Sequence, residues 1–421
     1  MVNANQFKGN SDAEIIREAI RNRGKDGIVI IPPRESEKEP ERDWWSLDSA
    51  ILLPENTTVI LQNCRIKLSD TCRDNFFRTA NCGMGIAMPK KIRNVHIQGI
   101  GRCILEGADR PRATGDASKI ISCPAPYKAE DLCRLADWIP EERRKPDKIN
   151  FMDWHGHSYG TDAGKEGESQ YGDWRGVGVL FANVDNFSIS NLHIAYSHGW
   201  GISLEACTNG RVEKIDFYAR MYKEIDGILQ NLENQDGIDI RNGCHNIFIS
   251  DITGVTGDDV VALTAIAAEG NYKPGGSLRT THVMHNDWSK RDRNISNISI
   301  RNVTAFSHYC YIIRLLAAGC TVKNVVIDGV IDTADEDARS LVGINLGCQN
   351  YGAAGVDSIS NVTISNVVCK SHDTIAIGGF VRDILINNVI NTAEGGNVLV
   401  EWPGSGVKNL VMNAVSVKND N

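Results

Sequence analysis

The stretch NQDGIDIRNGCHNIFISDITGVTGDDVVAL, residues Asn234 to Leu263, holds two acidic clusters that each lead directly into an apolar segment. Asp236 precedes IDI, and 22 residues later the adjacent pair Asp258 and Asp259 precedes VVAL. Between them lies NIFI, a segment of the form Asn-apolar-x-Ile that begins at Asn246. The recurrence indicates a fold in which positions about one such interval apart become neighbours.

The Asn-apolar-x-Ile segment repeats along the chain. It occurs as NVHI at 94, NFSI at 186, NISI at 297, NVVI at 324 and NVTI at 361, with DILI at 383 and NLVM at 409. Several successive starts lie 22, 26 or 27 residues apart, and longer intervals fit one repeat plus an insertion. Short strands repeating at this period are typical of a solenoid. The predicted fold class is therefore all-β, a parallel β-helix that crossover chirality makes right-handed.

The ends and interruptions of this repeat define the predicted organisation. Residues 1–33 are expected to form an N-terminal cap, with a helix that begins at the S-x-x-E capping box of Ser11 and Glu14, followed by the short strand GIVIIPP. Residues 107–175 and 265–293 lack strand periodicity and are predicted to be long loop insertions. The whole chain, 1–421, is interpreted as a single β-helix domain.

Composition excludes several classes of protein. A net charge of −8 and a pI near 5.7 argue against binding to nucleic acid or to an anionic membrane. There is no apolar run long enough to span a bilayer, and the first 25 residues carry no apolar signal core. The 12 cysteines are scattered without a CxxC pair, so a zinc knuckle is not expected. Together these features predict a cytoplasmic protein, although a secreted chain without its signal would look the same.

In a coil of about this length, Asp236, Asp258 and Asp259 occupy one angular position on adjacent rungs. Closely packed carboxylates repel, which raises at least one pKa. One protonated and one ionised carboxyl are what glycoside hydrolysis requires, as general acid and as activator of water. Two other interpretations remain open: aspartates that cap turns through their own backbone, and a calcium site. We predict no metal and no cofactor.

The run from Arg175 to Phe217, with NQDGIDI and GDDVVAL after it, resembles the polygalacturonase-like glycoside hydrolase family 28. That family combines N-x-D-G-x-D-I, a D-D pair, G-H-G and R-I-K on a right-handed parallel β-helix. The resemblance implies an inverting hydrolase in which Asp258 is the general acid, while Asp236 and Asp259 hold and activate water. It also implies that Asn234, Arg314 and Trp200 contact the substrate.

This chain departs from the family pattern at two places. The R-I-K motif appears as RLL, which keeps Arg314 but has Leu316 in place of the lysine. No G-H-G occurs, and His282 and His285 in THVMHND are the candidates nearest to its place. A uronate needs a matching positive charge, so the missing lysine weakens the case for polygalacturonate: either Arg314 alone binds the uronate, or the sugar beyond the scissile bond is neutral. The predicted substrate is a pectin-derived or other plant-type oligosaccharide. Loop tryptophans, Trp154, Trp174 and Trp288, are candidates for stacking on sugar faces.

Loops of a solenoid tend to emerge on one face, so the two insertions are predicted to close one end of the groove and favour exo-acting cleavage. The expected partner is an oligosaccharide or polysaccharide, and the oligomeric state is not predicted. Two alternative functions remain open. One is a polysaccharide lyase, which would need a basic residue as the catalytic base and commonly calcium. The other is a non-catalytic β-helix protein that binds glycan without cleaving it.

Overall fold

The structure, a computed structural model, describes residues 1–36, 39–70, 72, 74–83, 86, 88–109, 173–220, 222–225, 228–231, 235–266, 282–284, 291–335, 338–348 and 357–417. The predicted insertions 107–175 and 265–293 lie for most of their length outside these residues. Their conformation, and with it the boundaries of the proposed single domain, stays a prediction.

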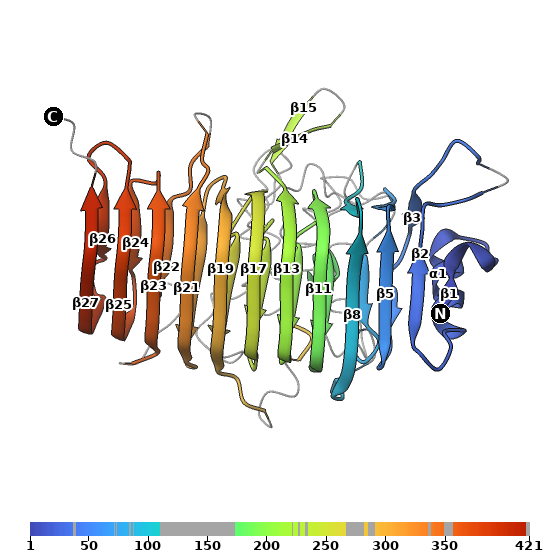
Figure 1. The fold of residues 1–421 in the computed structure, drawn as a ribbon, viewed down its shortest axis with the longest axis horizontal. Coiled ribbons are helices and arrows are strands. Elements are labelled where there is room, and N and C mark those ends of the chain that lie inside the picture. Colours follow the sequence, from blue (N-terminus) through green and yellow to red (C-terminus); the bar gives the residue numbers. More distant parts are fainter. Residues whose placement is uncertain are drawn as a thin grey trace, which may run out of the picture.

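The described strands stack along one axis in two long sheets (Figure 1). The first sheet runs in the order β1 (Val2–Asn3), β2 (Ile28–Ile31), β5 (Thr57–Gln62), β8 (Ile92–Ile100), β11 (Val184–Ala195), β13 (Thr208–Tyr218), β17 (His245–Thr256), β19 (Ile295–Ser307), β21 (Val322–Asp332), β23 (Ile359–Cys369), β25 (Phe380–Asn391) and β27 (Gly406–Val417). Three short strands, β3 (Trp45–Leu47), β6 (Arg65–Leu68) and β9 (Ile104–Glu106), pair with one another in that order and join the sheet where β9 pairs with β11.

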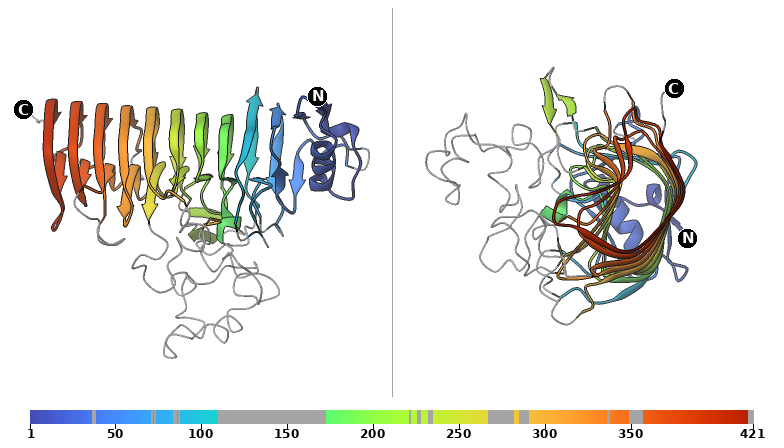
Figure 2. Two further views of the ribbon diagram at one scale, coloured as in Figure 1. Left: turned by 90° about the horizontal axis from the view of Figure 1, so that it is seen from below. Right: turned by 90° about the vertical axis from the view of Figure 1, so that its left-hand side faces the viewer.

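The second sheet follows the same axis on the other side of the core. Its order is β4 (Ile51–Leu53), β7 (Phe77–Thr79), β10 (Val179–Ala182), β12 (Ile202–Glu205), β16 (Ile238–Arg241), β18 (Val261–Ile266), β20 (Tyr311–Ala318), β22 (Val342–Leu346), β24 (Asp373–Ile377) and β26 (Asn397–Glu401). Strand pairs in both sheets are parallel, and the view along the axis in Figure 2 shows the coils superposed around a common core. The fold is a right-handed parallel β-helix, as predicted.

The repeated asparagines stack at one corner of the coils. Asn94, Asn186, Asn246, Asn297, Asn324 and Asn361 all have positive φ. Each side-chain amide donates to the carbonyl oxygen of the asparagine one coil earlier, for example Asn297 to Asn246 at 2.8 Å and Asn324 to Asn297 at 2.9 Å. Asparagine tolerates this backbone better than most residues, so the repeat both turns the chain and fixes the register of successive coils.

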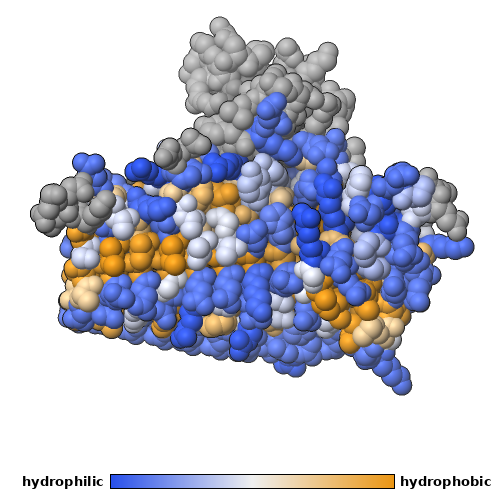
Figure 3. Space-filling model, turned by 45° about the horizontal axis from the view of Figure 1, so that its top comes forward, coloured by the Kyte–Doolittle hydropathy of each residue, from blue (hydrophilic) through white to orange (hydrophobic). Residues whose placement is uncertain are grey.

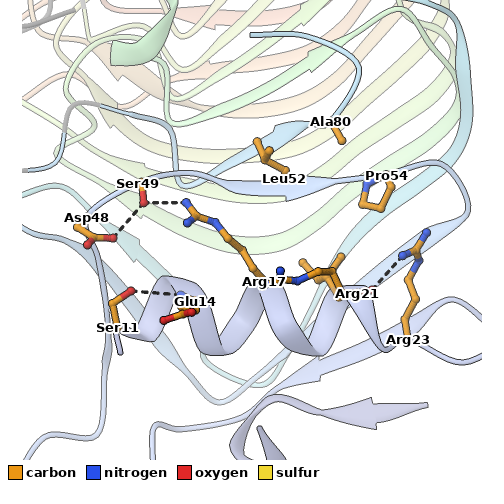
Figure 4. Close-up of a pocket in the computed structure, with 11 residues that line it drawn as sticks. Ser11, Glu14, Arg17, Arg21, Arg23, Asp48, Ser49, Leu52, Pro54 and Ala80 are labelled. Atoms are coloured by element: carbon orange, nitrogen blue, oxygen red, sulfur yellow. Dashed lines mark hydrogen bonds between the residues drawn. The ribbon is translucent and has the colours of Figure 1, made fainter. Parts of the chain in front are cut away.

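Helix α1 (Asp12–Arg21), preceded by the short 3-10 turn η1 (Ala4–Gln6), lies at the N-terminal end of the stack. The Ser11 hydroxyl accepts a hydrogen bond from the Glu14 amide at 3.3 Å, and the Glu14 carboxylate accepts one from the Asn10 amide at 2.6 Å. Ile16 and Ala19 are buried in the main core. The opposite side carries Arg17, which reaches over β4 to the Ser49 hydroxyl at 2.7 Å (Figure 4). Whether α1 acts as the predicted cap stays a prediction.

Two features depart from the regular coil. The antiparallel hairpin of β14 (Tyr222–Ile225) and β15 (Ile228–Asn231) projects beside the stack in Figures 1 and 2. A 3-10 turn, η4 (Asp173–Gly176), leads into β10.

Within the described ranges, no helix has the length and apolar character needed to cross a bilayer.

Candidate active site

The coil register brings the predicted acidic residues together on the outside of the second sheet. Asp236 lies directly before β16, and Asp258 with Asp259 lies directly before β18. The Gly237 amide donates to the Asp259 carbonyl oxygen at 2.8 Å, so the two turns are adjacent rungs. The 22-residue interval therefore places all three carboxyl groups in one cluster, as the sequence predicts.

A further aspartate, Asp239, belongs to this cluster and was missed by the sequence analysis. It lies within the same NQDGIDI segment, on β16, where its side chain is 1% exposed. Register pairs Asp239 with Ala262, and Ala262 with Arg314, so these residues form one outward row across successive coils. The signal was the alternation of IDI, because a polar residue between two core isoleucines faces outward.

Burial and mutual repulsion raise the pKa values of three members of this cluster, Asp236, Asp239 and Asp259. For Asp236, burial is the main cause, followed by the charges of Asp258 and Asp239. Burial also raises the pKa of Asp239, against the opposing effect of Arg241. The pKa of Asp259 rises to about 7, again mainly through burial, with Arg314 lowering it and Asp258 raising it. The carboxyl groups titrate as a coupled set, and the set retains protons near neutral pH.

Arg314, on β20, is the positive charge beside this cluster. Its Nη1 lies 3.4 Å from Oδ2 of Asp259, and its guanidinium stacks 4.6 Å from the centre of the Tyr311 ring. The Tyr311 amide donates to Oδ1 of Asp259 at 3.1 Å. Leu316, at the position of the family's lysine, packs in an apolar cluster with Ile266 and Ala318. Arg314 is thus placed where the sequence predicts, and apolar packing occupies the lysine position.

Cys310 is a second component that the sequence did not indicate. Its sulfur and carboxylate oxygens of Asp258 and Asp259 lie within 4.8 Å of one another. Burial, followed by the charges of these two aspartates, raises the pKa of the Cys310 thiol far above its usual range. A set that includes sulfur suits zinc or cadmium better than calcium, which takes oxygen ligands. The donor set therefore does not match the calcium alternative.

His282 lies in a buried polar network next to the carboxyl cluster. Its Nδ1 is 3.1 Å from the Glu205 carboxylate, and its Nε2 bonds the guanidinium of Arg241. Glu205 is fully buried and also accepts hydrogen bonds from the amides of Val283 at 3.0 Å and Met284 at 2.8 Å. Burial opposes ionisation of Glu205, but His282 and Arg241 outweigh it and lower its pKa. His282 therefore anchors a short segment of the 265–293 insertion to the wall of the β-helix.

Trp200 packs against the same network. It is 4% exposed, and its ring lies 4.5 Å from the Arg241 guanidinium carbon. Its contact with substrate stays a prediction, as do those of Asn234 and His285, which lie outside the described residues. Trp154 and Trp288 also lie outside them.

A small apolar cluster joins the ends of the two predicted insertions. Trp174 comes from the end of the first, Val177 follows just after this insertion, and Val283 and Met284 come from the second. They pack together over Leu180 and Ala182 of β10 and against Trp200. Trp174 is 1% exposed and stacks on Arg78 at 4.8 Å, so the suggestion that it stacks on a sugar face is wrong in this structure. The described residues Trp174, Val283 and Met284 of the two insertions thus meet the second sheet on the N-terminal side of the carboxyl cluster.

Several buried polar atoms in and beside the row of residues that carries the carboxyl cluster have no hydrogen-bond partner in the described part of the chain. They include Ser203 Oγ, Gln235 Oε1, Asp236 Oδ1, Asp239 Oδ2, Trp200 Nε1 and both side-chain polar atoms of Asn345. Such atoms are rare in folded proteins because each costs free energy. A wall with this many unmet donors and acceptors suits a ligand rich in hydroxyl groups.

Pockets formed by the described residues lie elsewhere. One of about 580 Å³ is bounded by α1 and β4 and lined by Arg17, Arg21 and Arg23 (Figure 4). Arg17 bonds Ser49 and Ala50, and Arg21 pairs with Glu18, so these arginines serve the packing of the helix. The carboxyl cluster, rather than this pocket, is therefore the candidate active site.

Comparison with known proteins finds one family whose model matches part of the chain. The family described as glycosyl hydrolases family 28 matches residues 150–276, which include Asp236, Asp258 and Asp259. The resemblance to glycoside hydrolase family 28 is confirmed. The family 28 match supports a glycoside hydrolase. It ends before Arg314, so the role of that arginine rests on its place beside Asp259. No curated protein sequence matches the chain.

Solved structures with the same fold include pectin-type enzymes and an adhesin. The chain is 17% identical to an exopolygalacturonase from Thermotoga maritima, with a TM-score of 0.54 over 98% of this chain and 92% of that one. It is 15% identical to an endo-xylogalacturonan hydrolase from Aspergillus tubingensis, with a TM-score of 0.56 over 99% and 93%. It is 13% identical to a surface adhesin of Streptococcus pneumoniae, with a TM-score of 0.51 over 99% of this chain and 92% of that one. At these identities the likeness shows the β-helix alone, so the choice of activity depends on the family 28 match and the site.

Proposed function

We propose that this protein is an inverting, exo-acting glycoside hydrolase of a pectin-derived or other plant-type oligosaccharide. The observation that carries the proposal is the cluster of Asp236, Asp239, Asp258 and Asp259, whose buried members have raised pKa values. Retained protons supply a general acid at neutral pH, and the remaining ionised carboxylate supplies a base. The unmet polar atoms around it offer binding partners for sugar hydroxyl groups.

In the proposed mechanism, the Asp258 carboxyl protonates the glycosidic oxygen as the bond to the anomeric carbon breaks. Asp236 and Asp259 hold a water on the opposite face of the sugar, and one of them takes its proton as the water attacks. Half-buried Asp258 is the more accessible of these carboxyl groups, which suits contact with a leaving group. The division of roles comes from the family 28 resemblance and not from the raised pKa values, which belong to Asp236, Asp239 and Asp259.

The exo proposal is supported by the filling of one side of the site. The apolar cluster of Trp174, Trp200, Val283 and Met284 covers the coils that come directly before the carboxyl cluster. A polymer lying along the helix axis would have to displace it. An oligosaccharide that enters by its end would occupy only the C-terminal side, past Arg314.

The specific alternative is a non-catalytic glycan-binding protein, because the fold is shared with an adhesin. A lyase would need a basic residue as the proton acceptor, and its product would carry a new double bond that absorbs ultraviolet light. A cytoplasmic location is likewise a proposal. It is supported by the ten described cysteines, which are all free and mostly buried.

The test is a time course on pectic oligosaccharides and aryl glycosides with the wild type and Asp258→Asn. Loss of a general acid is expected to reduce turnover by about 10²–10⁴-fold, with an unchanged circular dichroism spectrum. A single small sugar from the first time point supports exo attack, whereas an early ladder of intermediate lengths contradicts it. Binding without cleavage by the wild type would favour the adhesin-like alternative, and an ultraviolet-absorbing product would favour a lyase.

A further inference from the structure

The row of outward residues that contains Asp239 continues beyond Arg314. Register pairs Arg314 of β20 with Asn345 of β22, and Asn345 with Ala376 of β24. Adjacent coils lie about 4.8 Å apart, so Asn345 is the next side chain along the axis from Arg314. It lies on the side that the apolar cluster of Trp174, Trp200, Val283 and Met284 leaves uncovered.

Asn345 is buried without any hydrogen-bond partner. It is 0% exposed, and neither its amide nitrogen nor its carbonyl oxygen bonds another group of the described chain. Asn391, also 0% exposed, shows what a structural asparagine looks like here. Its nitrogen donates to Ser371, His372, Thr374 and Asn397 at 2.9–3.1 Å, and its oxygen accepts from the Ala393 amide at 2.8 Å. An apolar residue would suit position 345 better if the position served stability alone.

The described surroundings of Asn345 offer its amide no polar partner. Arg314 is occupied by Asp259 and by the Tyr311 ring. Farther along the sheet, Ala376 packs in an apolar cluster with Tyr311 and Val342, against which Trp402 also packs. Gly378 leaves room for the Trp402 ring, because a Cβ there would lie 2.5 Å from its Cε3 atom. The strip beyond Asn345 therefore combines small side chains with the rings of Tyr311 and Trp402, and an apolar, aromatic lining with few polar groups is typical of ligand sites.

We propose that Asn345 is a substrate-binding residue that selects a neutral sugar unit next to the scissile bond. An amide presents one donor group and one acceptor and carries no charge, which matches a hydroxyl group. A carboxylate only accepts and is bound best by a cation, which neither Asn345 nor apolar Leu316 supplies. This inference rests on the proposed hydrolase function and assigns its substrate class as oligosaccharides uncharged at this unit.

The experiment compares trigalacturonate with its methyl ester, a charged and a neutral form of one oligosaccharide. The wild type is expected to prefer the ester. Asn345→Leu removes the donor and the acceptor, so kcat/KM on the ester should fall about tenfold or more, while the melting temperature stays equal or rises. The matched Asn391→Leu should lower the melting temperature and leave the preference between substrates unchanged. Asn345→Asp, nearly isosteric, should lower the charged-to-neutral ratio of kcat/KM further, because it repels a carboxylate.

The outcomes separate this inference from the proposed function. An active wild type whose kcat/KM and preference survive both Asn345 substitutions overturns the role of Asn345 and leaves the hydrolase intact. So does an Asn345→Leu protein that loses stability as Asn391→Leu does, because that would make Asn345 structural. A wild type that cleaves neither substrate and no aryl glycoside overturns the hydrolase and, with it, the subsite.

Discussion

Asp259→Asn is predicted to stabilise the protein at neutral and alkaline pH while abolishing its activity. Asp259 is 2% exposed, and its pKa is raised from 3.8 to about 7, mainly by burial. The folded-state pKa therefore lies above the unfolded-state value. For such a carboxyl, stability is complete below the unfolded pKa and is lost as the pH rises through the folded pKa.

The size of the effect follows from the shift. A difference of about three pKa units corresponds to about 4 kcal/mol of lost stability above the folded pKa. An asparagine at position 259 does not ionise, so this loss of stability disappears. Its side-chain carbonyl oxygen can still accept the hydrogen bond from the Tyr311 amide. Loss of the 3.4 Å contact with Arg314 offsets part of the gain. We expect a net stabilisation of roughly 1–3 kcal/mol at pH 8 and less than about 1 kcal/mol at pH 4.

The assay is urea unfolding of the wild type and the variant at pH 4, 6 and 8. Asp332→Asn is the matched control, because Asp332 is also buried but accepts hydrogen bonds from Ala334, Lys370 and Ser371 at 2.9–3.0 Å. An amide cannot accept all of them, so this control should destabilise. The reasoning is refuted if Asp259→Asn also destabilises at pH 8, or if its gain does not grow between pH 4 and pH 8.

Two other perturbations test the groups around the carboxyl cluster. Glu205→Gln should destabilise the protein by about 3–5 kcal/mol, since it breaks the buried pair with His282 and weakens the anchoring of Val283 and Met284. The control is Glu401→Gln at an exposed position. Equal melting temperatures for the two variants would contradict the anchoring role of Glu205. Iodoacetamide should label Cys310 slowly at pH 8, because burial and the charges of Asp258 and Asp259 raise the pKa of its thiol. Peptide mapping should find faster labelling in Asp258→Asn, and an unchanged rate would rule out that electrostatic contact.

The sequence alone determined the coil and the central acidic cluster. Both depend on periodicity: an asparagine at each turn and a 22-residue interval between Asp236 and the pair at 258–259. In a solenoid, equal intervals along the chain become neighbours in space, so the register is readable without the tertiary structure. The ladder of asparagines and the adjacency of the turns before β16 and β18 confirm this.

Only the tertiary structure decided which other residues share the wall. Glu205 meets the amides of Val283 and Met284, 78 and 79 positions later, and the sulfur of Cys310 joins the carboxylates of Asp258 and Asp259. Insertions of unequal length separate these coils, so no interval along the chain predicts the pairs. The folded coils also decided which groups lose water: they buried Trp174 against Arg78, satisfied Asn391 completely and left Asn345 without a hydrogen-bond partner among the described residues. Burial and hydrogen-bond satisfaction depend on every surrounding coil at once, and a local pattern of residues cannot specify them.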